Sequence, residues 1–208
     1  MKEIVILADG EFPNHPVPVS KLKNSTCIIC CDGAASKLDK FGMEPYAIVG
    51  DLDSLPTRLK EKFQELLHQD YCQETNDLTK AFNFAKKLDP SSITILGATG
   101  MREDHTLGNI SLLTEYAHES CVPVEMYTNH GLFRVITKSG VFRSSKGVQI
   151  SFFTTDTNTR ISSKGLKYPL DDVVFDNWWK ASLNECTSNE YSLEIRSGNP
   201  IIVFTTYK

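Results

Sequence analysis

AIVGDLDSL (residues 47–55) is a short apolar run followed at once by two aspartates, Asp51 and Asp53. A strand buried on both faces has such a run, and the polar residues behind it mark the end of the strand. Two carboxylates this close repel each other unless a cation or solvent lies between them. For this motif alone, a polar loop with an aspartate at a helix start is an equally good interpretation.

The same pattern recurs through the first part of the chain. Strand candidates are EIVILA, TCIICC, YAIVG, SITILG and VEMYT. Between them, apolar residues recur every three or four positions, which predicts helices. The expected helix residues are Leu55, Leu59, Phe63, Leu66 and Leu67, then Leu78, Phe82, Ala85 and Leu88, then Leu107, Ile110, Leu113 and Ala117. Strand–helix alternation predicts an α/β domain with a doubly wound parallel sheet, covered on both faces.

From about residue 132 the pattern changes to short strands separated by turns. GVFRS, GVQISFF, YSLEI and PIIVFTT are the strand candidates, and FDNWWKAS is the one weak helix candidate. We expect an α/β domain over residues 1–131 and an all-β sandwich over residues 132–208. Trp178 and Trp179 are predicted to be core or interface residues rather than ligand-stacking ones.

Composition excludes several classes of function. The 208 residues are 40% hydrophobic and 23% charged, as in an ordinary globular protein of one or two domains. A net charge of -4 gives no electrostatic reason to bind nucleic acid or a membrane surface. The apolar runs are too short to cross a bilayer, and the first residues lack a signal-peptide cleavage site. We therefore expect a cytoplasmic protein without nucleic-acid or membrane partners.

The six cysteines are expected to be reduced. Cys27 and Cys30 form a C-x-x-C, but this pair lies inside an apolar, β-branched run, and no second pair completes a zinc site. Buried thiols are the better interpretation.

Polar residues follow the predicted strands where each strand ends. Asp32 and Gly33 follow TCIICC, Asp51 and Asp53 follow YAIVG, and Arg102, Asp104 and His105 follow SITILG, while Asp77 and Lys80 begin a helix. Parallel strands end at one edge of a sheet, so these side chains should share one rim. Carboxylates without histidine or cysteine favour a hard cation such as Mg2+, and Lys80 and Arg102 supply charge for phosphates. The chain lacks the P-loop and G-x-G-x-x-G motifs.

Each of these features also has a structural explanation. Asp77 and Lys80 can form a solvated helix pair, and Asp104 can complement a helix dipole. His105 can be an ordinary structural histidine. The functional interpretation depends on the positions of all these residues along one rim.

In order, the motifs resemble those of the thiamine pyrophosphokinase family over nearly the whole chain. The matching segments are Asp32-Gly33-Ala34, Gly50-Asp51-Leu52-Asp53-Ser54, Asn76-Asp77-Leu78-Thr79-Lys80, Gly97-x-x-Gly100-x-Arg102-x-Asp104-His105-x-x-x-Asn109, SSKGLKYPL (162–170) and Thr187-Ser188-Asn189-Glu190. G-D-x-D-S and G-x-x-G-x-R-x-D-H are specific together, whereas D-G-A alone is weak. The resemblance implies transfer of pyrophosphate from ATP to the hydroxyl of thiamine, giving AMP and thiamine diphosphate.

The resemblance also implies roles for individual residues. Asp51, Asp53 and Asp77 would hold Mg2+ on the triphosphate, and Asp51, Asp53, Asp77, Lys80, Arg102 and Asp104 would form the reaction site. Asp32, Gly33, Gln73, Gly97, Gly100, His105 and Asn109 would bind the nucleotide and substrates, and Ser188, Asn189 and Tyr191 would contact thiamine. The family is dimeric, so a homodimer with active sites shared between subunits is expected. Asp104 or Asp51 could accept the hydroxyl proton, and the sequence does not choose between them.

Two other functions remain open from the sequence. Asp51-x-Asp53 also resembles the D-x-D signature of aspartyl-phosphate phosphatases, although that class usually carries it on the first strand and here it follows the third. The other is a non-catalytic module that binds a nucleotide or vitamin, which would not need a full set of acids with Lys80 and Arg102.

Overall fold

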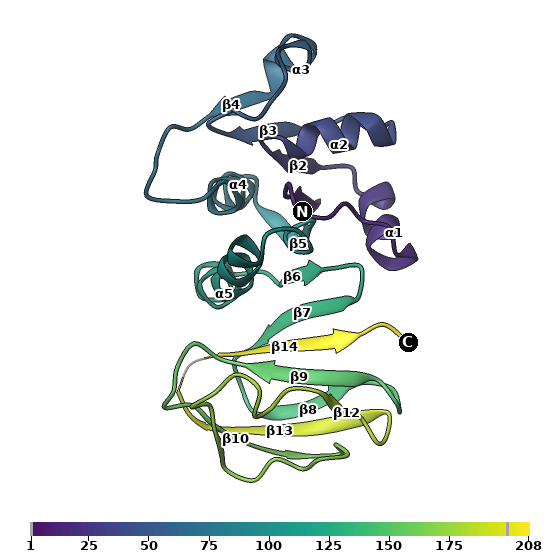
Figure 1. Ribbon diagram of the computed structural model, residues 1–208, viewed down its shortest axis with the longest axis vertical. Helices are drawn as coiled ribbons and strands as arrows, with labels where there is room; N and C mark the ends of the chain where they lie inside the picture. The colour runs from purple at the N-terminus through teal and green to yellow at the C-terminus, as the bar shows by residue number, and fades with distance from the viewer. Residues whose placement is uncertain (1, 199) are drawn as a thin grey trace. The chain divides into compact units, whose positions relative to one another are not determined.

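The structure, a computed structural model, describes residues 2–198 and 200–208 (Figure 1). It divides into two compact units, Met1–Asn129 and His130–Lys208. The division falls close to the 131/132 boundary expected from the sequence.

The first unit alternates strands and helices along the chain. Its elements are β1 (Lys2–Leu7), α1 (Pro16–Asn24), β2 (Ile28–Cys31), α2 (Ala34–Phe41), β3 (Ala47–Gly50), α3 (Thr57–Lys62), the short 3-10 helix η1 (Gln64–Leu66), β4 (Leu67–Gln69), α4 (Asp77–Lys86), β5 (Pro90–Leu96), α5 (Glu103–Glu119) and β6 (Val124–Tyr127). The five expected strands of this unit are all present.

The strands of the first unit form a parallel sheet in the order β6-β5-β1-β2-β3-β4. The strand order reverses between β1 and β5, and ligands of open α/β sheets bind at the carboxyl ends of the strands beside such a point. Figure 1 shows α1 and α2 on one side of the sheet and α4 and α5 on the other. The predicted doubly wound α/β fold is therefore confirmed.

Side-chain alternation explains why the strands are apolar throughout. Val5 and Leu7 of β1 pack in one cluster with Leu22 of α1 and Leu38 of α2. Ile4 and Ile6, which alternate with them along the strand, point to the opposite face and are also fully buried. A strand buried on both faces has no position for a polar residue until it ends.

One predicted helix is wrong in its second half. Leu55, Leu59 and Phe63 are buried as expected, but α3 ends at Lys62. Leu67, expected in the same helix, instead begins β4 and pairs with Ile48 of β3. The apolar spacing continued past the helix because these residues all pack on one core cluster, whatever their local backbone conformation.

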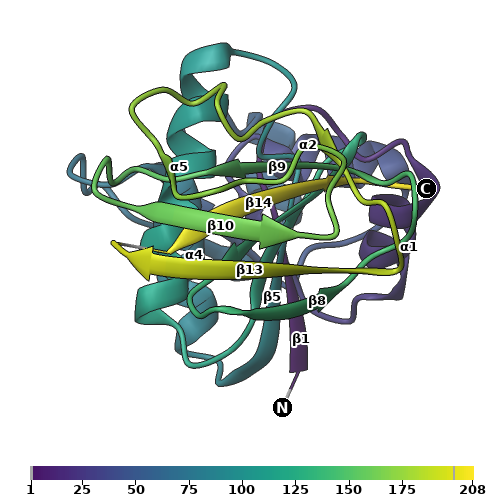
Figure 2. The same ribbon diagram turned by 90° about the horizontal axis from the view of Figure 1, so that it is seen from below.

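The second unit consists of strands. They are β7 (Gly131–Ile136), β8 (Gly140–Arg143), β9 (Gln149–Phe153), β10 (Arg160–Lys164), β11 (Val173–Val174), β12 (Asn184–Glu185), β13 (Glu190–Ser197) and β14 (Ile201–Thr206). β12-β9-β14-β7 form one antiparallel layer and β11-β10-β13-β8 another (Figure 2). Phe152 and Ile201 of one layer share a core with Ile161 and Leu193 of the other, which confirms the sandwich.

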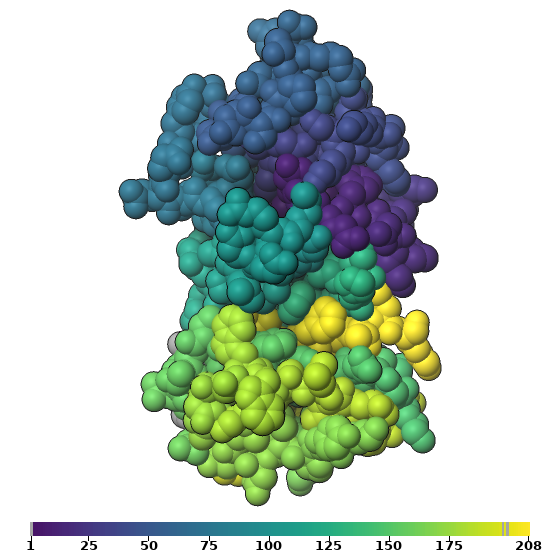
Figure 3. All heavy atoms as spheres, viewed as in Figure 1, coloured from purple at the N-terminus to yellow at the C-terminus, as the bar shows by residue number. Residues whose placement is uncertain are grey.

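The weak helix candidate FDNWWKAS is not a helix in the structure. Phe175 and Ala181 are buried at its ends, while the residues between them form turns at the surface (Figure 3). Trp178 is 45% exposed and Trp179 is 68% exposed, so neither is a core residue. Trp178 packs by its edge on Phe153. Of the two expected places for these tryptophans, the core is therefore wrong, and an interface stays a prediction.

All six cysteines are free thiols, and Cys27, Cys30, Cys31 and Cys186 are buried. Burial raises the pKa of the Cys31 thiol well above its ordinary value. Within the described residues, no helix has both the length and the apolar character needed to cross a membrane.

Candidate functional site

The segments that follow β1, β2, β3, β4 and β5 border one cavity of about 430 Å3 in the first unit. It is lined by Ala8, Asp9, Gly10, Cys31, Asp32, Gly33, Asp51, Ser54, Gln73, Thr75, Asn76, Asp77, Leu78, Lys80, Ala98, Thr99, Met101, Arg102, His105, Thr106 and Asn109. Among the residues expected from the sequence, Asp53, Gly97, Gly100 and Asp104 are immediate chain neighbours of this lining. Ser188, Asn189 and Tyr191 belong to the second unit.

Three carboxylates form the closest acidic group in the described part of the chain. One oxygen each of Asp32, Asp51 and Asp53 lie within 4.8 Å of one another. Asp32 is 4% exposed, and its Oδ2 accepts a hydrogen bond of 3.0 Å from the backbone N–H of Ser54. Its Oδ1 is buried without a hydrogen-bond partner. Burial, reinforced by the neighbouring acids, raises the pKa of Asp32 to about 6.

The backbone around this group holds the acids in place. Asp32 has φ +37° and Leu52 has φ +67°, conformations that are uncommon outside glycine. The Asp53 N–H donates to Asp51 Oδ1 at 3.2 Å, and the Ser54 hydroxyl donates to Asp53 Oδ1 at 2.9 Å. The serine hydrogen bond lowers the pKa of Asp53. Asp53 therefore remains ionised beside Asp32.

Gly50 lies where β3 ends, and its neighbours leave little room for a side chain. Its φ is +154°, and an added Cβ would lie 3.0 Å from Asp32 Cβ and 3.3 Å from Asp77 Oδ1. The backbone of Gly50 is thus flanked by two acids from different loops, Asp32 and Asp77. A glycine here brings them close to the Asp51 segment.

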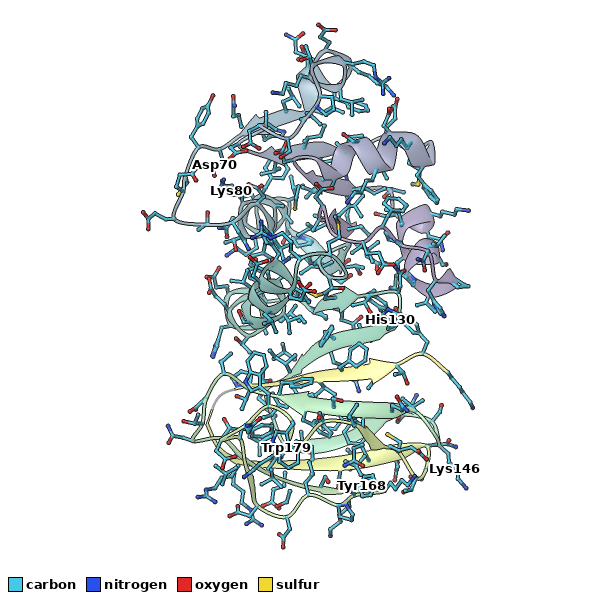
Figure 4. The ribbon with its side chains drawn as sticks, viewed as in Figure 1. Asp70, Lys80, His130, Lys146, Tyr168 and Trp179 are labelled. Carbon is cyan, nitrogen blue, oxygen red and sulfur yellow. The ribbon has the colours of Figure 1, made fainter. Side chains whose placement is uncertain are left out.

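Lys80 supplies a fixed positive charge beside Asp77. It lies on α4 (Figure 4). Its side chain is only 4% exposed. Its Nζ donates to Asp77 Oδ1 at 3.1 Å. A lysine this deeply buried needs such a partner, and the ion pair fixes both groups at the edge of the cavity.

The start of α4 is tied to α5. Asn76 is the N-cap of α4, and its side-chain oxygen accepts from the Thr79 N–H at 2.9 Å. The Asn76 amide also donates to Asn109 Oδ1 at 3.2 Å, and the Asn109 amide donates to the Ala98 carbonyl at 2.8 Å. These bonds fix the position of Asp77 relative to the loop after β5.

Arg102 and Asp104 form an exposed pair at the start of α5. Two guanidinium nitrogens of Arg102 donate to the two carboxylate oxygens of Asp104. The His105 N–H also donates to Asp104 Oδ1 at 2.8 Å. The arginine, more than the histidine N–H, lowers the pKa of Asp104 to about 2. The Arg102 side chain is 73% exposed, so it can turn toward an anion in the cavity.

Gly97 and Gly100 allow two loops to approach each other. An added Cβ on Gly97 would lie 2.5 Å from the Ala8 carbonyl oxygen, and one on Gly100 would lie 2.5 Å from Glu11 Oε2. Both glycines have positive φ, at +65° and +84°. Their role in the structure is to pack the loop after β5 against the loop after β1.

The segment expected to contact thiamine divides into exposed and buried residues. Ser188 and Asn189 are exposed, and the Ser188 hydroxyl donates to the Glu190 carbonyl at 2.7 Å. Tyr191 is 1% exposed and packs between Phe142 and Phe152, with its hydroxyl accepting from Arg134 at 3.3 Å. This corrects the expectation that the Tyr191 ring flanks a ligand, because its faces are covered by the core.

Comparison with protein families gives two matches that follow one another along the chain. The thiamin pyrophosphokinase catalytic domain matches residues 19–125, and the substrate-binding domain of thiamin pyrophosphokinase matches residues 131–204. The chain belongs to the thiamin pyrophosphokinase family. The first match contains the predicted site residues Asp32, Asp51, Asp53, Asp77, Lys80, Arg102 and Asp104, and the second contains Ser188 and Asn189.

Two curated relatives carry the family name. Thiamine pyrophosphokinase 1 of Oryza sativa subsp. japonica is 30% identical over 115 residues, covering 43% of this chain and 44% of that protein. Thiamine pyrophosphokinase of Bacillus subtilis (strain 168) is 34% identical over 117 residues, covering 54% of this chain and 55% of that protein. The chain thus spans about half the length of the curated relatives it matches.

Solved structures share the fold over the whole chain. Thiamine pyrophosphokinase from Bacillus subtilis superposes with a TM-score of 0.81 at 24% identity and covers 100% of both chains. Thiamin pyrophosphokinase from Candida albicans superposes with a TM-score of 0.80 at 18% identity, covering 99% of this chain and 90% of that one. These likenesses establish that both units have the fold seen in solved thiamin pyrophosphokinases.

Some residues of the cavity were not predicted from the sequence, although one of them follows a strand as the predicted acids do. Asp9 follows β1 just as Asp32 follows β2, and it also lines the cavity. Thr99 and Met101 also line it, but nothing in their local sequence marks them.

Proposed function

We propose that the protein is a thiamine pyrophosphokinase that transfers pyrophosphate from ATP to the hydroxyl of thiamine, giving AMP and thiamine diphosphate. The main support is one cavity in which acids from three strand ends lie with Lys80 and Arg102, in a chain of this family. Such a transfer requires positioning and charge neutralisation rather than a covalent protein nucleophile.

The acids fit a hard divalent cation, and we propose Mg2+. The group consists of carboxylates, and the buried Oδ1 of Asp32 has no protein partner. Oxygen donors of this kind are the ligands that Mg2+ prefers. We assign Asp51, Asp53 and Asp77 as its ligands, with Asp32 close enough to join them. When bound, the ion would neutralise charge on the triphosphate.

The protein's own residues would orient the substrates. Lys80, fixed by burial, presents its ammonium to the phosphates, and Arg102 leaves Asp104 to bind them. Gly33, Gln73, His105 and Asn109 would border the nucleotide. Asp104 or Asp51 could accept the hydroxyl proton, and pairing with Arg102 lowers the pKa of Asp104 to about 2 only until Arg102 turns to the phosphates.

We assign thiamine recognition to Ser188 and Asn189, and we propose a cytoplasmic homodimer with active sites shared between subunits. The exposure of both side chains and the match to the substrate-binding domain support the first assignment. The resemblance of the motifs supports the dimer. Six free thiols and a net charge of -4 are compatible with the cytoplasm.

Incubation of the protein with ATP, MgCl2 and thiamine tests the reaction. We expect AMP and thiamine diphosphate in equal amounts by chromatography, and neither when thiamine or magnesium is left out. Inorganic phosphate released without thiamine would instead identify an aspartyl-phosphate phosphatase. Substrate binding with no turnover would identify a non-catalytic binding module.

A mixture of two inactive variants tests the shared site. If each site takes the acids of one subunit and Asn189 of the other, a mixed dimer of Asp51→Asn and an inactive Asn189 variant has one intact site of two. Random exchange of equal amounts makes half of the dimers mixed, so about a quarter of wild-type activity should return. Subunits are exchanged by denaturation and co-refolding, and mass spectrometry verifies the mixed dimers. Mixed dimers with no activity would place each site within one chain.

A further inference from the structure

Lys37 on α2 is held by an unusually complete set of acceptors. Its Nζ donates to the backbone carbonyls of Asp9 and Gly10, each at 2.7 Å, and lies 2.8 Å from Asp9 Oδ1. The Sδ of Met101 lies 3.8 Å away. An ammonium has three donors, so the three oxygens satisfy it fully. Neither the sequence motifs nor the proposed reaction assigns this lysine a role.

The acceptors of Lys37 belong to two loops that both line the cavity. Asp9 and Gly10 follow β1, and Met101 follows β5. The same loops are joined by backbone hydrogen bonds from Gly10 to the Gly97 carbonyl at 2.6 Å and from Glu11 to the Thr99 carbonyl at 2.8 Å. Lys37 reaches this junction from a third element, α2. It thus fixes one wall of the cavity relative to the helix that begins behind Asp32.

Lys37 also compensates a charge that faces the acids. An added Cβ on Gly33 would lie 2.7 Å from Asp9 Oδ2, so the Asp9 carboxylate lies directly over Gly33, next to Asp32. Asp9 is a further acid in a cavity that already holds several, and a polyphosphate is strongly anionic. Without Lys37, the unpaired Asp9 charge would repel that ligand.

We infer that Lys37 is a positioning residue for nucleotide binding: it joins the loops after β1 and β5 and neutralises Asp9, so that this wall accepts a polyphosphate. The inference rests on the proposed function, since it assigns the nucleotide phosphates to this cavity. Lys37 acts through Asp9, Gly10 and Met101 and does not itself touch the reacting atoms.

The test compares Lys37→Met with the wild type in two measurements. Titration calorimetry in the presence of MgCl2 gives the Kd for ATP, and steady-state kinetics give the KM for ATP and for thiamine. Loss of a charge-assisted contact predicts an increase of about tenfold in the Kd and KM for ATP, with the KM for thiamine unchanged. Lys37→Arg keeps the charge and should remain within about threefold of the wild type. Lys40→Met removes an exposed lysine of the same helix and should have no effect.

A double-mutant cycle with Asp9→Asn isolates the charge compensation. Lys37→Met/Asp9→Asn should recover most of the ATP affinity lost in Lys37→Met, because no uncompensated carboxylate remains. An unchanged Kd for ATP in Lys37→Met, equal increases in both KM values, or no recovery in the double variant would overturn the inference. If the wild type makes no AMP, the proposed function fails, and the ATP titrations still decide the role of Lys37. A wild type that binds no ATP overturns both.

Discussion

The cavity rim of the first unit and the hairpins of the second unit collect polar residues in opposite ways. At the rim, acids separated by many residues in the sequence meet because parallel strands end at one edge of a sheet. In β13 of the second unit, neighbours alternate, so Tyr191 and Leu193 are buried while Glu190 and Glu194 are exposed. A parallel sheet therefore brings together charged residues from loops that are distant in the sequence. An antiparallel hairpin brings together mainly the residues of its own turn.

Asp32 at the rim carries a cost in stability that Tyr191 itself does not have. Asp32 is buried with one unpartnered oxygen and φ +37°, next to like charges. Tyr191 is buried in an apolar core with a hydrogen bond on its hydroxyl. Strain and unpaired polar atoms are typical of functional sites, while satisfied burial is typical of structural residues. Five predictions test this contrast.

The largest expected effect is on catalysis, from Asp51→Asn or Asp53→Asn. Each removes one negative charge from the proposed metal ligands, and we expect AMP formation to fall by about a thousandfold or more. The fold should be retained, because Asp51 is only partly buried and Asp53 is exposed. Activity at saturating MgCl2 and circular dichroism provide the two measurements.

Asp89→Asn is the matched control for these two variants. Asp89 is exposed and has φ +49°, a conformation that asparagine adopts as readily. It should keep full activity. Near-normal turnover in Asp51→Asn or Asp53→Asn would remove them from the metal site.

The sequence predicted the rim well because its rule is geometric. Once the strands ending before Asp32, Asp51 and Ala98 were recognised as parallel, their loops had to meet. What the pattern could not give was which acids lie closest: Asp32, rather than Asp77, joins Asp51 and Asp53 within 4.8 Å. That depends on the backbone at Gly50 and Leu52, whose positive φ values no spacing rule reveals.

The second unit was less predictable in its details. Tyr191 was expected at a ligand, yet Tyr191, Leu193 and Ile195 alternate with polar residues, which indicates a core face. Large apolar side chains suggest a core, but Trp179 is mostly exposed, so only the interface alternative stays a prediction for the tryptophans. Strand pairing sets the face of Tyr191, whereas the tryptophans lie in a turn at the surface.

The next largest effect is expected from Gly50→Ala, which tests whether the rim depends on a backbone without a side chain. The added Cβ would contact Asp32 and Asp77 at 3.0–3.3 Å, and φ +154° is strained for alanine. We expect a loss of roughly 2–3 kcal/mol in the free energy of unfolding, with loss of activity. Gly108→Ala, in an open position of α5, should instead stabilise by about 0.5–1 kcal/mol. Urea unfolding of both variants distinguishes local crowding from a general effect of alanine.

Asp32→Asn should raise the stability of the metal-free protein while abolishing turnover. The pKa of Asp32 is raised from 3.8 to about 6, so the native state holds this proton more tightly than the unfolded state. The contribution of the Asp32 carboxyl group to the free energy of unfolding therefore falls as the pH rises from about 4 to 6, and it remains lost above pH 6. Asparagine removes this loss, so the variant should be more stable by about 2 kcal/mol at pH 7.5 and no more stable at pH 4. Urea unfolding in EDTA at both pH values measures it, and equal differences at the two pH values would contradict the assignment.

Asn189→Ala tests whether the exposed turn of the second unit recognises thiamine. Loss of one polar contact should raise the KM for thiamine by about tenfold and leave the KM for ATP unchanged. The KM for ATP is the internal control, because general damage would change both values. Equal changes would remove Asn189 from the thiamine site.

The smallest effect is expected from Tyr191→Phe. This variant tests whether Tyr191 is a structural residue of the core or a residue of the binding site. The change removes the hydroxyl that accepts from Arg134 at 3.3 Å and keeps the ring between Phe142 and Phe152. A structural residue should lose about 1 kcal/mol in the free energy of unfolding, because one partly buried hydrogen bond is lost. The KM for thiamine should remain within about twofold, since the buried ring offers no face to a substrate. A large increase in that KM with unchanged stability would return Tyr191 to the binding site and show that the second unit opens its core to its ligand.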